Sequence, residues 1–145
     1  MALWIKTNSA GDMFMSANGN AGGFTQGLGL AIPSGWACSS GQLYFNMANG
    51  TTRDTALCSS ASVRDGKWHH VVVVISRTAG VKSFYIDGKF DNSNSITISG
   101  SVTNPKLFLG KTNWDNWFNG SMDDVRIYNR ALSATEVAQL YSLGK

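Results

Sequence analysis

Glutamate is nearly absent from this sequence, which limits the chemistry that the protein can perform. Glu136 is the only glutamate in 145 residues, and the remaining acidic residues are aspartates spread along the chain. Glycosidases need two carboxylates that face each other at a fixed separation, and many serine hydrolases carry a Gly-x-Ser-x-Gly elbow, which this sequence lacks. The composition therefore predicts a protein that is not an enzyme.

Charged residues and long apolar runs are also scarce. Only 14% of residues are charged, the formal net charge is +3, and lysines and arginines stand singly rather than in the runs that track a phosphate backbone. The longest apolar run, Val71–Ile75, is far too short to span a membrane, and the N-terminus carries no leader-like pattern. We expect neither a nucleic-acid partner nor a membrane span.

The abundant residues are those of a β-rich core. Hydrophobic residues make up 43% of the chain, and 145 residues are the size of one domain, expected here over residues 1–145. Short β-branched and aromatic segments alternate with Gly, Asn, Ser and Asp at a spacing typical of an all-β, two-sheet antiparallel jelly-roll sandwich. The expected strands are Leu3–Lys6, Met13–Ser16, Leu28–Ile32, Gln42–Met47, His69–Ser76, Lys82–Asp87, Ser95–Ile98, Lys106–Leu109 and Met122–Tyr128.

One strand and one helix can be placed more closely. Val71–Ile75 is apolar at every position, so we expect the core on one face of this strand and an outer layer on the other. A short C-terminal helix is the expected outer layer, because Ser133 and Glu136 match a capping box. Its apolar face would hold Val137, Leu140 and Tyr141.

Two hairpin turns are indicated. Asp87 and Gly88 separate two extended segments, and a tight turn needs the positive φ that glycine accepts. Cys38 and Cys58 flank a second hairpin, whose turn is expected at Ala48–Gly50. A disulfide between them would stabilise the fold by roughly 3 kcal/mol and fits an oxidising compartment. The alternative is a pair of buried free thiols.

Three motifs occur in the order found in one known family. They are Lys67–Val73 (KWHHVVV), Phe84–Lys89 (FYIDGK) and Phe118–Ser133 (FNGSMDDVRIYNRALS). Together they resemble the successive signatures of laminin-G-like, concanavalin A-like jelly-roll domains, over nearly the whole chain. The resemblance implies a two-sheet antiparallel β-sandwich, usually extracellular or at the cell surface, that binds glycans or proteins and often carries calcium.

The sequence departs from this family at its start. Such domains usually have an extra strand before the segment that resembles Leu3–Lys6, and here only Met1 and Ala2 precede it. The first strand of the family is therefore expected to be missing or replaced. An uncovered edge at this place would invite pairing with a second chain, so self-association is a further expectation.

Tryptophans suggest where a sugar binds. Trp4 and Trp68 stand where the family packs aromatics, and we expect them in the core. Trp114 and Trp117 instead lie in a polar segment between two expected strands, where a ring can stack on a sugar while amide and carboxylate groups bond its hydroxyls. The expected polar partners are Asn113, Asp115 and Asn116, and Trp36 is a weaker candidate of the same kind.

A calcium ion is the expected cofactor, if there is one, with Asp123 as its ligand. Strand alternation would send Asp123 and Asp124 to opposite faces, with one of them buried and Arg126 beside Asp124. A structural hydrogen-bonding role for Asp123 is the alternative. The neighbouring His69 and His70 would also face opposite sides, so they are not expected to bind one ion together.

The function that fits these features is a non-catalytic, carbohydrate-binding module of a secreted or surface protein. Its partner would be a carbohydrate or glycoprotein, bound through Trp114 and Trp117. The alternative is a protein–protein interaction or adhesion domain, in which the same exposed rings form the contact.

Overall fold

The computed structural model describes residues 1–20, 23–35, 37–102, 107–111 and 117–144, with the side chains of all of these except 12–20 and 23–25. Its elements are β1 (Ala2–Lys6), β2 (Gly11–Asn20), β3 (Gly23–Ile32), β4 (Gln42–Asn49), β5 (Leu57–Ser62), β6 (Trp68–Ser76), β7 (Val81–Ile86), β8 (Lys89–Ser95), β9 (Phe108–Leu109), β10 (Ser121–Arg126) and α1 (Ala134–Leu143). The first sheet has the order β10-β1-β6-β7-β8, and the second has the order β5-β4-β3-β2-β9.

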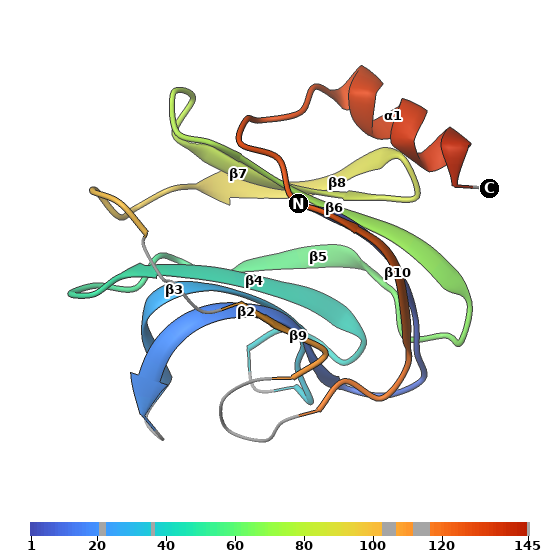
Figure 1. The fold of residues 1–145 in the computed structure, drawn as a ribbon, viewed down its shortest axis with the longest axis horizontal. Coiled ribbons are helices and arrows are strands. Elements are labelled where there is room, and N and C mark those ends of the chain that lie inside the picture. Colours follow the sequence, from blue (N-terminus) through green and yellow to red (C-terminus); the bar gives the residue numbers. More distant parts are fainter. Residues whose placement is uncertain (21–22, 36, 103–106, 112–116, 145) are drawn as a thin grey trace.

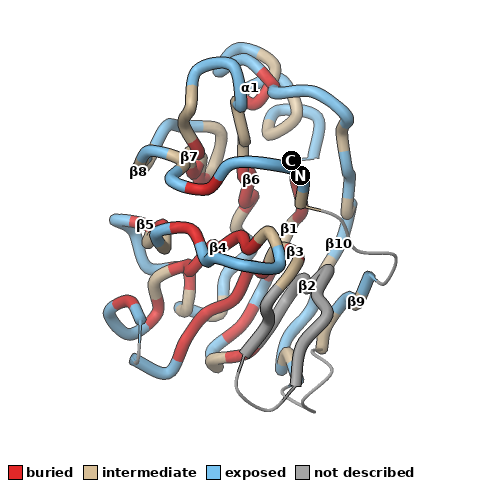
Figure 2. The backbone as a smooth tube through the Cα atoms, turned by 90° about the vertical axis from the view of Figure 1, so that its left-hand side faces the viewer, coloured by how far each residue is buried: buried red, intermediate tan, exposed pale blue. Residues whose placement is uncertain are grey.

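The two sheets pack face to face. Figure 1 shows them as two layers, with α1 on the outer side of the first sheet, and Figure 2 shows buried stretches on strands of both sheets. All pairings within the sheets are antiparallel. This confirms the predicted all-β jelly-roll sandwich. The fully buried core includes Leu3, Ile5, Val71 and Phe84 from the first sheet and Leu30, Leu43, Phe45 and Met47 from the second.

Strand β6 lies in the middle of the first sheet and is covered on both faces, as its apolar run predicts. Val71 and Val73 belong to the core between the sheets, whereas Val72 and Val74 pack in a second cluster with Val137 of α1. Successive side chains of a strand point to opposite faces, so an unbroken apolar run suits this position. The helix is the predicted outer layer.

Helix α1 begins at the predicted capping box. The Ser133 hydroxyl accepts a hydrogen bond from the Glu136 backbone N–H at 3.3 Å, and the Glu136 carboxylate accepts one from the Ser133 backbone N–H at 2.8 Å. Hydrogen bonds from Arg130 and then from Ser133 lower the pKa of Glu136 to about 2, so the cap stays ionised at neutral pH. Among the described residues, no helix is long and apolar enough to cross a membrane.

The Asp87–Gly88 turn joins β7 to β8, as predicted. Both residues have positive φ, 52° for Asp87 and 78° for Gly88, which is the backbone that a tight hairpin with the right-handed strand twist requires. The Asp87 carboxylate also accepts hydrogen bonds from the His69 ring and the His70 backbone N–H. The turn is therefore tied to β6 as well as to its own strands.

Strands β5 and β8 differ from the sequence prediction. A strand is predicted at Ser95–Ile98, but β8 ends at Ser95, and no strand is predicted where β5 lies. Polar side chains of β8 reach across to the backbone of β5 and to the residue before it. The Asp91 carboxylate accepts from the Ser60 N–H at 2.7 Å, and the Asn94 amide donates to the Ala56 carbonyl at 2.8 Å. These contacts join the two sheets along one edge.

Cys38 and Cys58 form the predicted disulfide, with their Cα atoms 5.7 Å apart. Cys58 lies on β5, opposite Tyr44 of β4, while Cys38 lies in the segment between β3 and β4 rather than on a strand. The bridge therefore ties this segment to β5 instead of linking the two strands of the hairpin. The alternative of two free thiols does not hold in this structure.

Strand β1 is not at an edge of the first sheet. It pairs with β10 on one side and with β6 on the other, and the Met1 ammonium donates a hydrogen bond to the Val73 carbonyl at 3.0 Å. The uncovered edge that we expected beside β1 is therefore filled by β10. Self-association stays a prediction, but an uncovered edge beside β1 no longer supports it.

Candidate functional site

Trp117 is the one residue of the predicted late-loop sugar site that the structure describes. Its side chain is 60% exposed. The ammonium nitrogen of Lys111 lies 4.8 Å from the centre of the Trp117 ring, a cation–π distance, and the two residues pair as an isolated β-bridge. Sequence reasoning missed Lys111, because no local pattern links this lysine to Trp117.

The backbone around Trp117 is held in place from two sides. The next residue, Phe118, packs against the core between the sheets, so Trp117 faces outward. Gly11 of β2 approaches so closely that a Cβ at that position would lie 2.7 Å from the Trp117 carbonyl oxygen, and glycine alone permits such an approach. Trp117 therefore presents an exposed ring on a fixed backbone. We call Trp117 and Lys111 together the Trp117 platform.

The other residues of the predicted sugar site lie outside the described residues. These are Trp36, Asn113, Trp114, Asp115 and Asn116. Their roles stay predictions. Two exposed leucines, Leu107 and Leu109, precede Lys111 in the described part of this segment, so the segment that leads to the platform carries exposed apolar side chains.

A second concave surface lies on the outer side of the first sheet, beside the C-terminal end of α1. Its volume is about 720 Å³, and its lining includes Trp4 and Trp68, Asp123 and Asp124, and Tyr141. We call it the helix-end cleft. It brings together residues from β1, β6, β10 and α1 that are far apart in the sequence. Tyr141 was predicted only as part of the apolar face of the helix.

The predicted core positions of Trp4 and Trp68 are wrong. Trp4 lies between Leu3 and Ile5, which both point into the core, so its own side chain points to the outer face of the sheet. There it stacks on Tyr141 at 5.6 Å between ring centres. Trp68 is 43% exposed. Both rings therefore line the helix-end cleft instead of the space between the sheets.

The predicted opposite placement of Asp123 and Asp124 is also wrong. Asp124 has a positive φ of 53°, and the register between β1 and β10 shifts between Ala2 and Trp4, as expected for a β-bulge. The extra residue breaks the alternation, so both carboxylates are exposed and line the same cleft. The predicted pairing of Asp124 is confirmed, because Arg126 donates to its carboxylate at 2.8 Å.

The fit of a calcium ion at Asp123 can be judged from the oxygens around it. Calcium takes about six to eight oxygen ligands. At this site Asp124 is already engaged by Arg126, and Asp123 accepts the Asp124 backbone N–H at 2.7 Å. Among the described residues, no three His, Cys, Asp or Glu side chains gather closely enough to hold a metal ion. Those residues offer calcium few ligands, and the calcium site stays a prediction.

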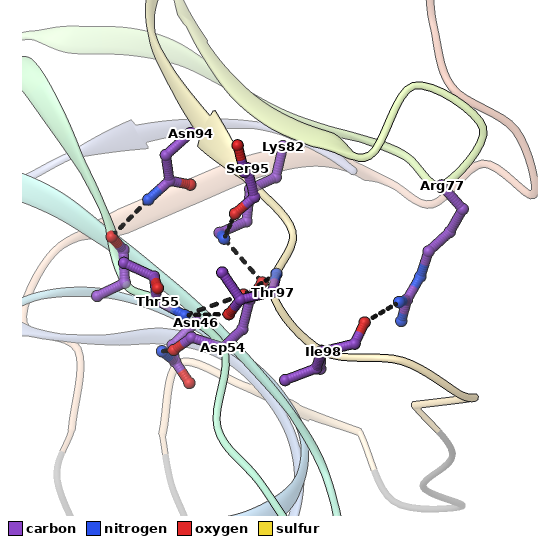
Figure 3. Close-up of polar contacts among 10 residues, drawn as sticks. Asn46, Asp54, Thr55, Arg77, Lys82, Asn94, Ser95, Thr97 and Ile98 are labelled. Carbon is purple, nitrogen blue, oxygen red and sulfur yellow. Dashed lines mark hydrogen bonds and ion pairs between the residues drawn. The ribbon is translucent and has the colours of Figure 1, made fainter.

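In two further clusters, the charged side chains are paired with one another and have a structural role. Between the sheets, the Lys82 ammonium donates to the Asp54 carboxylate at 2.7 Å, and Figure 3 shows Thr97 bonded to the same carboxylate. Near the start of β6, the His69 ring bridges Asp65 and Asp87, at 3.0 and 2.9 Å. The first cluster is closed to ligands by burial, and the second joins two turns.

Relatives of known sequence match this chain over part or all of its length. Usherin of Mus musculus is 29% identical over 106 residues, which cover 68% of this chain and 2% of usherin. Adhesion G-protein coupled receptor V1 of Danio rerio is 20% identical over 146 residues, which cover 98% of this chain and 2% of the receptor. The chain thus spans about 2% of the length of these relatives.

A solved structure and a family model agree with the observed fold. The carbohydrate-binding module CBM40 of the Ruminococcus gnavus IT-sialidase, bound to α2,3-sialyllactose, matches with a TM-score of 0.73 at 17% identity, over 97% of this chain and 80% of that chain. The laminin-G-type model of the concanavalin A-like lectin/glucanases superfamily matches residues 1–138. The motifs, the two-sheet sandwich and this match agree, and the chain therefore belongs to the concanavalin A-like lectin/glucanases superfamily.

Proposed function

We propose that this protein is a non-catalytic carbohydrate-binding module and that the Trp117 platform carries its binding. The exposed ring on a fixed backbone is the observation that supports the proposal most strongly. A flat indole stacks on the C–H face of a sugar, and a ring on a fixed backbone leaves less chain entropy to be lost on binding. Lys111 lies over the ring and adds a donor for sugar hydroxyl or carboxylate groups. Asn113, Trp114, Asp115, Asn116 and Trp36 are the proposed additional contacts.

Other features agree with a binding module outside the cell. The sialidase module with the same fold has sialyllactose bound, and that likeness makes a glycan a reasonable ligand to test. The Cys38–Cys58 disulfide is the kind of bond that persists in an oxidising compartment. The only glutamate, Glu136, is engaged in the cap of α1, so we propose no catalytic pair of carboxylates.

An adhesion domain that binds protein is the second candidate. The match to an adhesion G-protein coupled receptor favours it, as do the exposed leucines Leu107 and Leu109 on the segment before Lys111. Exposed apolar surface of this kind occurs at protein interfaces. In this case the Trp117 ring would be an anchor for a protein partner instead of a sugar.

A glycan array tests the proposal with the wild-type protein and the variant Trp117→Ala. We expect the wild type to bind a subset of glycans, and the variant to lose binding by roughly tenfold or more, because the stacking surface is gone. Leu107→Ala is the matched control, since it removes another exposed apolar side chain of the same segment. Both variants should melt close to the wild-type temperature.

Three results would contradict this function. A large fall in the melting temperature of Trp117→Ala would mean that the ring is part of the folded core. An equal loss of binding in Leu107→Ala would point to a general apolar contact rather than stacking. A wild type that binds no glycan but captures the extracellular part of a protein partner would favour the adhesion domain.

A further inference from the structure

The helix-end cleft has an aromatic wall whose rings hold one another in place. Trp4 stacks on Tyr141 with an angle of 23° between the rings, and His70 lies against both, at 5.2 Å from Trp4 and 6.1 Å from Tyr141. Trp68, at the start of β6, adds a ring that is 43% exposed. A site with rings fixed before a ligand arrives pays little to order them on binding.

The polar groups of the cleft are mainly acceptors. The Asp123 carboxylate accepts one hydrogen bond, from the Asp124 backbone N–H, and makes no other in the described part of the chain. The Asp124 carboxylate is neutralised by Arg126 at 2.8 Å. No lysine or arginine is among the described residues that line the cleft. Among the described residues, Asp123 therefore has no ion-pair partner in a cleft that also holds the exposed Trp68 ring, and Lys6, which pairs with Trp68 across the strands, is not among the lining residues.

The floor of the cleft does not supply the missing positive charge. His70 is 3% exposed beneath Trp4 and Tyr141, and its Nδ1 atom is buried without a hydrogen bond. Burial lowers the pKa of His70, which keeps its ring neutral at pH 7. The neutral His70 ring therefore does not neutralise the charge of Asp123.

We propose that the helix-end cleft binds an alkylammonium group, with Asp123 as the counter-ion and the Trp68 ring as the surface over which the cation lies. Cations are attracted to the face of an indole, and a carboxylate beside the ring adds to this attraction. The proposal concerns a different surface from the Trp117 platform and does not depend on sugar binding there. The ammonium group can belong to a quaternary amine or to a primary amine, such as that of an amino sugar.

Two other ligands use parts of the same surface. A neutral sugar can stack on Trp68 but leaves the charge of Asp123 unpaired. A calcium ion would be attracted to Asp123, but calcium prefers oxygen ligands to aromatic rings, and the neighbouring Asp124 carboxylate is already paired with Arg126. The alkylammonium group is the ligand that uses both the ring and the unpaired charge.

NMR titration of the tryptophan indole N–H signals tests the proposal. Two pairs of probes separate charge from shape: choline with its uncharged carbon isostere, and glucosamine with glucose. We expect the charged member of each pair to shift the Trp68 signal and to bind roughly tenfold more tightly or better than its neutral partner, which is the difference expected for one charge-assisted contact. Raising the salt concentration should weaken this binding.

Variants locate the site. Asp123→Asn and Trp68→Leu should each weaken choline or glucosamine binding by about tenfold, and the remaining Trp4 indole signal reports binding in the second variant. Ile127→Ala is the matched control, because it removes an exposed apolar side chain that does not line the cleft and should leave the titration unchanged. Melting curves check that each variant is folded.

Several outcomes would overturn the proposal. Equal binding of glucosamine and glucose would make the cleft a neutral sugar site. A shift of the Trp68 signal that calcium produces but neither choline nor glucosamine produces would make the cleft a metal site. Loss of the response in Ile127→Ala, or no response at saturating choline and glucosamine, would also refute an alkylammonium site here.

Discussion

Lys82 and Asp54 form an ion pair between the two sheets, with the ammonium nitrogen 2.7 Å from the carboxylate and both side chains fully buried. Lys82 comes from β7 of the first sheet, and Asp54 from the segment between β4 and β5 of the second. The ammonium also donates to the Ser95 carbonyl at 3.0 Å, and Asp54 accepts from Thr97 through its hydroxyl and its backbone N–H (Figure 3). These bonds offset part of the cost of removing two charges from water.

Removing one member of this pair should destabilise the protein strongly. We expect Lys82→Met or Asp54→Asn to lower the free energy of unfolding by about 3–5 kcal/mol, because each leaves the other charge buried without its partner. The double variant should recover part of this loss. Urea unfolding measures all three. Lys67→Met is the control, because Lys67 pairs with Asp65 at the surface and its loss should change little.

The same pair predicts a dependence on acid. Burial alone would raise the pKa of Asp54, but the hydrogen bonds from Lys82 and Thr97 outweigh it and hold the pKa below its ordinary value of 3.8. A carboxyl whose pKa falls on folding stabilises the protein above the unfolded pKa, and this contribution is lost as the pH falls through the folded pKa. Acid unfolding of Asp54→Asn should therefore be less steep below pH 3.8 than that of the wild type. Equal slopes would contradict this assignment.

Adjacent histidines on β6 should give opposite dependences on pH. Burial tends to lower the pKa of His69, but hydrogen bonds to Asp87 and Asp65 outweigh it and raise the pKa above 6.5. Burial lowers the pKa of His70 below 6.5. His69 therefore stabilises the fold below pH 6.5 and loses this effect as the pH rises through its folded pKa, whereas His70 destabilises the fold as the pH falls below 6.5.

Single variants separate these two contributions. In His69→Gln the contribution of His70 remains and that of His69 is removed, so the free energy of unfolding should rise between mildly acidic and neutral pH. In His70→Phe, which keeps an aromatic ring against Trp4, stability should fall as the pH rises above 6.5 through the folded pKa of His69. Unfolding free energies over this range and NMR titration of the two rings provide the measurements. Two rings that titrate at the same pH would contradict the prediction.

The disulfide should matter for stability but not for the fold. Cys38 and Cys58 are separated by 20 positions, and opening a loop of this size costs roughly 3 kcal/mol in the chain-entropy account. Reduction, or replacement of both cysteines by serine, should lower the melting temperature while leaving the β-sheet circular dichroism unchanged. A reduced protein that melts at the wild-type temperature would show that the bridge adds no stability.

Local patterns were enough to predict several elements. The Asp87–Gly88 turn, the strand around Val71–Ile75 and the helix cap at Ser133 and Glu136 each depend on residues close together in the sequence. Their chemistry is the same in any tertiary setting, because a positive φ or a capping bond needs no distant partner. The sequence motifs added the family, and with it the two-sheet antiparallel sandwich.

The missed features depend on residues that are distant in the sequence. Strand β8 is polar because Asp91 bonds the backbone of β5 and Asn94 bonds the residue before β5, and a period-two pattern cannot show this. Lys82 is buried because Asp54 lies opposite it. The bulge at Asp124 breaks the strand alternation, so the carboxylates of Asp123 and Asp124 lie on the same face of the sheet. For the candidate sites, this means that Trp117 was predictable as an exposed ring, whereas the helix-end cleft was not.

The helix docks through Tyr141, and a glycine in the hairpin makes room for it. Gly88 has a φ of 78°, and a Cβ added there would lie 2.9 Å from the Tyr141 ring. Gly88→Ala should therefore destabilise the protein twice: by about 1–2 kcal/mol from the left-handed backbone, and further by pushing the helix away from Trp4. Gly80→Ala isolates the first effect, because Gly80 has a φ of 65° and open space around it. We expect urea unfolding to show a larger loss for Gly88→Ala, and near-ultraviolet circular dichroism to change in that variant alone. Equal losses in the two variants would mean that Tyr141 moves aside at no cost and that the helix is only loosely attached to the sheet.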